Sequence, residues 1–350
     1  MEDTAVKDGS TDSFKALPKI DLHRHLEGSL RLATLFELAD EGKINLPADL
    51  EALSAVSTLI STDPAEPQSL LEKFQTLRRV YTSPELIQRY VREAVADAAA
   101  DGIIHLEMRF SPMALAGEKQ FAVPEVIAWV LEAADQAAEQ EAIEVKLIAS
   151  VNRHEPLETA ERIAGAVLDY KSDRLVAFDL AGDEESFAAD DFIPLFQEVQ
   201  SGGLRITVHA GEWSGAEAVQ LAVEEFHADR IGHGVRIIES PDVVALAREK
   251  AVPFEVCPLS NIASGIAAGW QDHPIREMVL AGLVVTLNTD NPGILGTTMS
   301  EELSLLTSET DLTVTSIKAF MLNAVNAAFL STNEKKALEQ KLLSAYQMGM

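Results

Sequence analysis

Short apolar runs alternate along most of the chain with longer segments in which apolar residues return every three or four positions. The short runs predict eight β-strands, at Lys19–His25, Ile103–Ser111, Val145–Arg153, Leu175–Leu180, Arg205–His209, Arg230–His233, Pro253–Pro258 and Leu283–Asp290. The longer segments predict helices, among them Pro124–Gln140, Leu157–Leu168, Phe187–Val199, Gly215–Phe226 and Pro241–Lys250. Repeated alternation of strand and helix predicts a parallel sheet, and eight nearly continuous apolar strands predict a closed (β/α)8 TIM barrel.

Two regions exceed what a barrel needs, because such a barrel takes roughly 250 residues and this chain has 350. Residues 29–100 read as a helical insertion after the first strand. The spacing of Leu70, Leu71 and Phe74 suits a hydrophobic lid over the barrel mouth, although ordinary core packing gives the same spacing. Residues 300–350 predict additional closing helices. Residues 1–15 are polar and acidic and predict a flexible tail, so residues 16–350 are expected to form a single domain.

The charge balance narrows the possible partners. The chain has 28 Lys and Arg against 56 Asp and Glu, a formal net charge of −28, which argues against nucleic acid or an anionic membrane as partner because both would be repelled. The single cysteine, Cys257, excludes an internal disulfide and a cysteine-rich metal site. No apolar run approaches the roughly 20 residues of a membrane span, and the N-terminus lacks signal-peptide features, so a cytoplasmic protein is expected.

Histidines and carboxylates stand where several predicted strands end. His23 and His25 share one face of the first strand, roughly 7 Å apart at Cα, and can hold one ion together, although a bare His-x-His also arises by chance. Three later strands end in His209-Ala-Gly-Glu212, Gly-His233-Gly and Asn-Thr-Asp290-Asn291. Because barrel active sites form at the carboxyl ends of strands, these side chains are expected to meet. Such ligands suit Zn²⁺ or a similar divalent ion.

Six motifs occur in one order between residues 19 and 292, and as an ordered set they resemble the adenosine deaminase family of metal-dependent amidohydrolases. They are Asp-Leu-His23-Arg-His25-Leu-Glu27-Gly, Phe-Asp-Leu-Ala-Gly182-Asp-Glu, His209-Ala-Gly-Glu212, Arg-Ile-Gly-His233-Gly, Phe-Glu255-Val-Cys-Pro-Leu-Ser and Leu-Asn-Thr-Asp290-Asn291-Pro. The resemblance implies one Zn²⁺ per chain, held by His23, His25, His209 and Asp290. It implies that Glu212, His233 and Asp290 are catalytic. It also implies substrate contacts from His25, Glu27, Gly182, Asn291, Leu70, Leu71 and Phe74.

The chemistry of replacing an aromatic amine by oxygen explains this set of residues. Zn²⁺ supplies a nucleophile at neutral pH because it lowers the pKa of bound water to about 7. Attack at C6 of the purine pushes electrons onto ring N1, and Glu212, if burial keeps it protonated, can deliver a proton there. His233, between two glycines, is expected to orient the attacking water, and Asp290 can share its proton.

The remaining candidates have weaker support. Arg109, Arg153 and Glu255 lie at strand ends and either support the metal ligands from behind or form structural ion pairs. His105, His154, His227 and His273 have no partner motif and are interpreted as structural or surface residues, with His227 the most exposed.

The expected function is zinc-dependent deamination of adenosine and 2′-deoxyadenosine, a purine-salvage reaction that releases ammonia. A sibling enzyme acting on adenine, on an N6-substituted adenine nucleotide or on another adenosine-derived metabolite is the first alternative. A catalytically inactive nucleoside-binding barrel is the second, although no expected ligand or acid is missing. A site of the cytidine deaminase type is excluded, because it needs Pro-Cys-x-x-Cys and the chain has one cysteine.

One position departs from the commonest pattern of the family, in which Asp290 would be followed by a second aspartate that binds purine N7. Here it is Asn291, whose amide carries N–H donors at every pH, so the contact to N7 can persist. A 5′-phosphate is expected to be rejected, because Glu27 would repel it and no basic cluster is apparent in the sequence.

Overall fold

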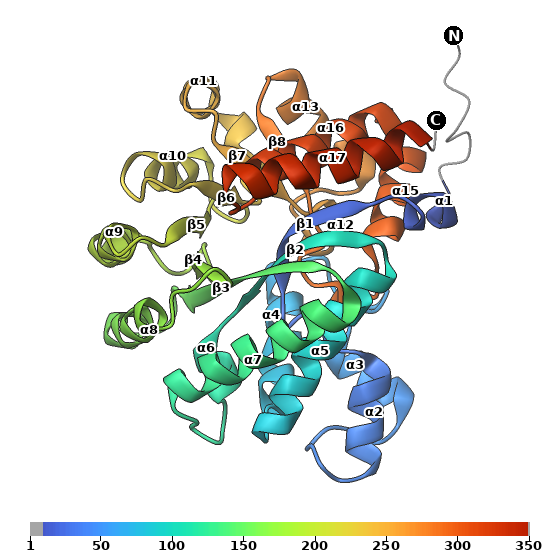
Figure 1. Ribbon diagram of the computed structural model, residues 1–350, viewed down its shortest axis with the longest axis vertical. Coiled ribbons are helices and arrows are strands. Elements are labelled where there is room, and N and C mark those ends of the chain that lie inside the picture. Colours follow the sequence, from blue (N-terminus) through green and yellow to red (C-terminus); the bar gives the residue numbers. More distant parts are fainter. Residues whose placement is uncertain (1–9, 349–350) are drawn as a thin grey trace.

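All eight predicted strands are present in one parallel sheet in the computed structural model, which describes residues 10–348 (Figure 1). The strands pair in sequence order, each with the next. Their bounds are β1 Lys19–His25, β2 Ile103–Phe110, β3 Glu144–Asn152, β4 Leu175–Ala181, β5 Arg205–His209, β6 Arg230–Gly232, β7 Pro253–Val256 and β8 Val284–Leu287. The (β/α)8 barrel is therefore confirmed, with most predicted strands ending slightly too late.

The barrel closes through the chain that follows β8. Arg24 forms an isolated parallel bridge with Asp290. The amide of His25 donates to the carbonyl of Asp290, and the amide of Asp290 donates to the carbonyl of His23, both at 2.8 Å. The first strand is thus joined to the last at the carboxyl end of the barrel, where the predicted ligands lie.

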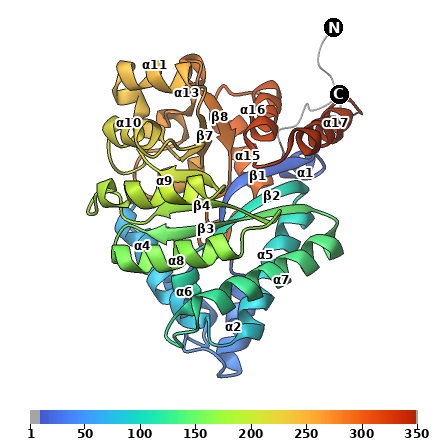
Figure 2. The same cartoon turned by 60° about the vertical axis from the view of Figure 1, so that its left-hand side comes forward.

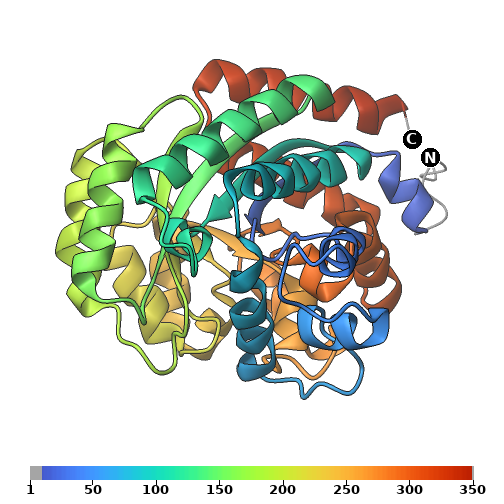
Figure 3. The same cartoon turned by 90° about the horizontal axis from the view of Figure 1, so that it is seen from below.

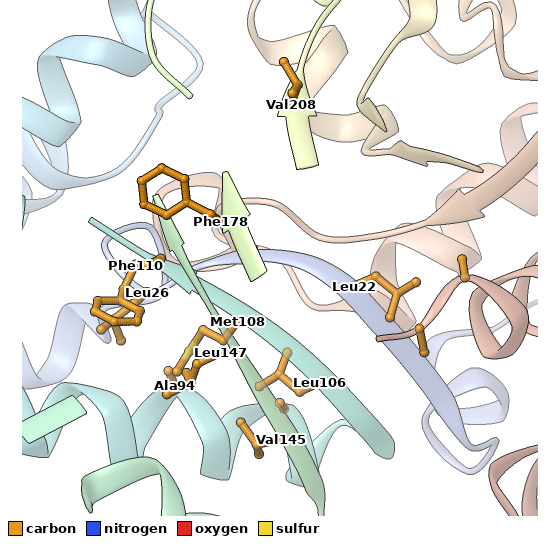
Figure 4. Close-up of a cluster of buried hydrophobic side chains, with 14 of the residues drawn as sticks. Leu22, Leu26, Ala94, Leu106, Met108, Phe110, Val145, Leu147, Phe178 and Val208 are labelled. Atoms are coloured by element: carbon orange, nitrogen blue, oxygen red, sulfur yellow. The ribbon is translucent and has the colours of Figure 1, made fainter. Parts of the chain in front are cut away.

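Side chains on the strands alternate between two different environments. On β2, Leu106, Met108 and Phe110 are buried on the outer face of the sheet, and Figure 4 shows Met108 beside Ala94 of α5 (Pro84–Ala100). The intervening residues His105, Glu107 and Arg109 are equally buried but point into the barrel. There Glu107 and Arg109 meet charged residues of strands across it, and His105 lies beside Glu107. The hydrophobic core therefore lies between sheet and helices, whereas the interior of the barrel is polar.

The helices surround the strands, as Figures 2 and 3 show. Those after β2 to β6 are α6 Pro112–Ala116, α7 Val123–Glu141, α8 Leu157–Asp169, α9 Ile193–Ser201, α10 Ala216–Glu224 and α11 Pro241–Glu249, and those around β7 and β8 are α12 Pro258–Ala263, α13 Ile275–Leu280 and α14 Pro292–Leu295. The prediction for Phe187–Val199 is wrong at its start, because α9 begins at Ile193, with Pro194 in its first turn. Phe187 is instead 42% exposed.

Both predicted surplus regions are helical. The insertion between β1 and β2 contains α2 Leu32–Asp40, α3 Leu50–Ser57, α4 Pro67–Leu77 and α5, with a 3₁₀ turn at Arg78–Val80. The chain ends in α15 Met299–Glu309, α16 Val314–Ala327 and α17 Thr332–Met348. Within residues 10–348, no helix combines the length and the apolar character that crossing a membrane requires.

The N-terminal segment is more ordered than its composition suggests. Thr11–Lys15 forms α1, capped by the Ser10 side chain, and Phe14 is fully buried. Lys19 Nζ donates to the carbonyls of Phe14 (2.7 Å) and Leu17 (2.9 Å). The predicted tail of residues 1–15 is therefore wrong for residues 11–15, because one aromatic side chain and one lysine anchor them; residues 1–9 lie outside the described part of the chain.

The substitution Phe14→Ala tests this anchoring. Removing a fully buried phenylalanine should lower the free energy of unfolding by about 3–5 kcal/mol, measured by urea denaturation. Phe187→Ala is the matched control, since its exposed ring should change the same quantity by no more than about 0.5 kcal/mol. Equal effects of the two substitutions would show that α1 is not docked.

Candidate metal centre and active site

Four potential metal-binding atoms converge at the carboxyl end of the barrel. His25 Nε2 lies 3.3 Å from His209 Nε2 and 3.4 Å from Asp290 Oδ1, and His23 Nε2 lies 3.5 Å from the same oxygen. His23 and His25 come from β1, His209 ends β5, and Asp290 follows β8. Although His23 Nε2 is fully buried, it has no hydrogen-bond partner among the described residues.

These distances fit one tetrahedral Zn²⁺. Zn–N and Zn–O bonds of about 2.0–2.1 Å place neighbouring ligand atoms about 3.3 Å apart, close to the observed spacing. A second group, His23, His233 and Cys257, also brings donor atoms within 4.8 Å of one another, but it shares His23. Burial raises the pKa of the Cys257 thiol well above its usual value, which disfavours the thiolate that a metal would need.

The other ring nitrogens of two histidines are held by buried carboxylates. His23 Nδ1 contacts Glu255 Oε2 at 2.7 Å, and His209 Nδ1 contacts Asp179 Oδ1 at 3.2 Å. Arg109 links these carboxylates, with Nη2 2.6 Å from Glu255 Oε2 and Nη1 3.4 Å from Asp179 Oδ1. A carboxylate on Nδ1 fixes the tautomer that leaves Nε2 free for a metal.

Burial shifts the pKa values of Glu212 and His233 in opposite directions. Burial raises the pKa of Glu212 well above its usual range, and the nearby charges of Asp290 and Glu184 raise it further. Burial lowers the pKa of His233 well below its usual value. His233 Nδ1 lies 3.5 Å from Glu212 Oε1, and Asn261 Nδ2 reaches both, at 3.1 Å and 3.3 Å. The surroundings therefore favour the protonated form of the Glu212 carboxyl and the neutral form of the His233 imidazole.

The loop that carries Glu212 is fixed by one buried side chain. The carboxylate of Glu184 accepts hydrogen bonds from the backbone amides of four successive residues, Gly211 (2.6 Å), Glu212 (3.0 Å), Trp213 (2.9 Å) and Ser214 (3.3 Å). Arg153 Nη2 donates to the carbonyl of His209 at 2.5 Å, at the start of the same loop. These hydrogen bonds fix the backbone of Glu212 and of the candidate ligand His209 relative to each other.

Strained backbone also occurs here. His233 and Asp290 have φ values of 58° and 60°, a conformation that non-glycine residues rarely adopt. Such conformations are typical of functional sites, where the surrounding structure enforces them.

A cavity of about 510 Å³ opens above the four donor atoms. With the exception of His23, which lies beneath its floor, every predicted site residue lines it: His25, Glu27, Leu70, Leu71, Phe74, Gly182, His209, Glu212, His233, Asp290 and Asn291. Leu70, Leu71 and Phe74 lie on α4, and the Phe74 ring is 6.3 Å from that of His25. The insertion after β1 thus forms one wall of the cavity.

Several residues at the cavity escaped the sequence analysis. Arg78, His154, Asp183 and Phe187 line it, so a cation is present where no basic cluster was apparent. His154 was interpreted as structural or surface; it is exposed, but it faces the cavity two residues after β3. His273 is buried against Asn261 (3.2 Å), His105 is buried beside Glu107 (3.2 Å), and His227 is exposed, as predicted. The position of His154 after a strand was the available signal.

Comparison with known proteins gives consistent matches over nearly the whole chain. The family described as Adenosine deaminase matches residues 18–345. The adenosine deaminase of Shewanella loihica is 34% identical over 324 residues, which cover 92% of this chain and 97% of that protein. The solved adenine deaminase of Arthrobacter aurescens has a TM-score of 0.86 at 27% identity, covering 95% of this chain and 99% of its own. A Zn-bound amidohydrolase from Burkholderia ambifaria has a TM-score of 0.88 at 25% identity, covering 99% and 95%.

Close packing of Gly28 on Asn291 provides a test of the cavity wall. A Cβ at Gly28 would lie 2.0 Å from Asn291 Oδ1, so Gly28→Ala should displace Asn291 and lower the free energy of unfolding by about 1–3 kcal/mol. Gly165→Ala, where nothing lies within 4 Å of the added methyl, is the control and should be neutral or stabilising. The measurement is urea denaturation of both variants, and an unchanged stability of Gly28→Ala would contradict this packing.

Proposed function

The chain belongs to the adenosine deaminase family, and on this premise we propose that it hydrolyses adenosine and 2′-deoxyadenosine to inosine and 2′-deoxyinosine with release of ammonia. One observation carries the proposal: three imidazole nitrogens and a carboxylate oxygen converge beside the buried carboxyl of Glu212 in a cavity of about 510 Å³. An inactive binding barrel would not need such a costly set of buried groups.

His23, His25, His209 and Asp290 would hold one Zn²⁺. When bound, the ion supplies a nucleophile at neutral pH because it lowers the pKa of water. The spacing of the four donor atoms and the free Nε2 of His23 support this assignment. So does the likeness to the Zn-bound amidohydrolase from Burkholderia ambifaria.

Glu212 and His233 would manage the protons of the reaction. Glu212, whose pKa burial raises well above its usual range, would donate a proton to purine N1 as C6 is attacked. His233, whose pKa burial lowers well below its usual value, would orient the attacking water and accept charge as that water loses its proton. Both side chains line the same cavity, which supports assigning them to one purine ring.

The cavity wall would recognise the purine and the ribose. Asn291 lines the cavity and is 2% exposed, and we assign the N–H donors of its side-chain amide to purine N7, which is an acceptor. Gly182, at φ 94°, brings backbone to the cavity without a side chain. Glu27 Oε1 accepts from the amide of Ser111 at 2.6 Å, which orients the carboxyl for a ribose hydroxyl.

Two alternative substrates each have one observation in their support. The likeness to an adenine deaminase makes the free base an alternative substrate. Arg78 at the cavity makes a phosphorylated nucleoside a second alternative substrate. Burial raises the pKa of the Glu27 carboxyl to about 7, so this group keeps part of its negative charge at neutral pH and would repel a phosphate. The hydrophobic wall of α4 and the depth of Glu27 favour the neutral nucleoside.

Replacing Glu212 by glutamine tests the proton donor. The amide keeps the shape of the side chain but cannot deliver a proton to N1, so kcat for adenosine should fall roughly 10²–10⁴-fold while zinc content is retained. Glu217→Gln, an exposed carboxylate of α10, is the matched control and should leave kcat unchanged. Near-parental turnover of the Glu212 variant would assign the proton to another group.

A substrate panel tests the reaction itself. We expect the highest kcat/KM for adenosine and 2′-deoxyadenosine, lower values for adenine and adenosine monophosphate, and no ammonia release by chelator-treated enzyme. The 7-deaza analogue of adenosine should be poor, because it would leave the Asn291 amide unpaired in a buried position. Equal values for adenosine and its 7-deaza analogue would remove Asn291 from recognition. Preference for adenine or the monophosphate would reassign the substrate.

A further inference from the structure

The carboxylate that holds His23 is itself held from the opposite end of the barrel. Glu255 Oε2 contacts His23, and its other oxygen, Oε1, accepts a hydrogen bond from Nε of Arg230. Both Glu255 and Arg230 are fully buried. Arg230 is the first residue of β6, so it lies toward the amino end of the strands, away from the cavity.

Arg230 is in turn fixed by β2 and by the connection between α16 and α17. Its Nη2 lies 2.7 Å from Glu107 Oε2, and its Nη1 donates to the carbonyl of Ala327 at 3.0 Å. The guanidinium carbon is 3.6 Å from the centre of the Phe329 ring. Glu107 Oε1 accepts from the amide of Phe329 at 2.5 Å. The backbone at residues 327–329 therefore contacts both members of the Glu107–Arg230 pair.

Continuous contacts thus run from the α16–α17 connection to a candidate metal ligand: Phe329 amide, Glu107, Arg230, Glu255, His23. Every side chain between the two ends is fully buried, so solvent does not screen the charges along this path. A shift of Arg230 would leave Glu255 Oε1 without this partner. Glu255 would then be held only at Oε2, by Arg109 and His23, and could reorient together with the His23 ring.

We infer that Glu107 and Arg230 are positioning residues for the metal centre, and that docking of residues 327–329 is thermodynamically coupled to metal binding at the other end of the barrel. The inference rests on the metal site given under the proposed function. Coupling of this kind is reciprocal: a loosened connection weakens metal binding, and a bound metal tightens the connection. Neither Glu107 nor Arg230 touches the donor atoms or the cavity.

A purely structural role for the same residues makes a different prediction. Loss of a structural ion pair would destabilise the metal-free and metal-loaded proteins equally. Loss of a positioning residue would also reduce the stabilisation that metal adds, because that increment depends on metal affinity. The decisive readouts are therefore the dissociation constant for Zn²⁺ and the rise in melting temperature on metal addition.

The first test compares Glu107→Gln with Glu334→Gln. Glu334, 46% exposed, accepts from the amide of Ser331 at the same end of the barrel and contacts none of the residues on the path, which makes it a matched control. Zn²⁺ affinity is measured on metal-stripped protein by competition with a chromophoric chelator. Glu107→Gln should bind Zn²⁺ at least tenfold more weakly, as substitutions behind metal ligands commonly do, with a smaller metal-induced rise in melting temperature. Glu334→Gln should match the parent.

Parental affinity in a folded Glu107→Gln variant would overturn the coupling alone, whereas failure of the parent to bind Zn²⁺ would overturn the metal assignment in the proposed function. If Glu107→Gln does not fold, Phe329→Leu removes only the ring over Arg230 and should weaken Zn²⁺ binding about threefold or more. Unchanged affinity in Phe329→Leu would count against the coupling.

Hydrogen exchange on the unmodified chain gives an independent measurement. Metal should slow exchange of the Phe329 amide at least tenfold, while the Ala52 amide, which the Asp49 side chain caps on α3, stays unchanged. No change at Phe329, or equal slowing at both amides, would contradict a specific coupling between the two ends of the barrel.

Discussion

Charged groups inside the barrel must be paired with one another, because none of them is exposed to solvent. Most (β/α)8 barrels fill this space with branched apolar side chains. Here Glu107, Arg109, Asp179, Arg230 and Glu255 occupy it, all fully buried. An unpaired ion in such a place costs several kcal/mol or more, so each group is fixed by its partners. The orientation of the histidines, and therefore of the cavity floor, depends on this arrangement.

The same burial gives opposite results for different carboxyl groups, depending on which charges lie beside them. Burial alone would raise the pKa of Glu255, but Arg109 and Arg230 hold it well below the usual range. Glu212 is also buried, yet its charged neighbours are Asp290 and Glu184, so burial and repulsion both raise its pKa. Glu255 therefore stays an ionised acceptor for His23, whereas the surroundings of Glu212 favour its protonated form.

Much of the fold and of the candidate site was predictable from the sequence, and the features that were missed have physical causes. Strand ends located His25, His209, His233 and Asp290, because a parallel barrel gathers its carboxyl ends at one mouth. Helix α1 was missed because the burial of a single side chain, Phe14, orders a segment whose overall composition is polar. Glu107 and Arg230 were missed because they lie 123 residues apart in the sequence and meet only across the closed barrel. Arg78 gave no signal, because its place depends on how the insertion folds.

The seam between the first and last strands has a consequence for how the protein is made. The candidate ligand set takes two residues from β1 and one from the segment after β8, so a growing chain lacks its fourth ligand until residue 290 has been synthesised. Residues 327–329, which pack on Arg230, emerge later still. Chains are synthesised from the N-terminus at about 5–20 residues per second, so His23 and His25 precede Asp290 by roughly 13–53 s. Capture of a metal by these residues would therefore be a late event in biogenesis, and a chain interrupted before α16 ends would have the histidines without the surroundings that orient them.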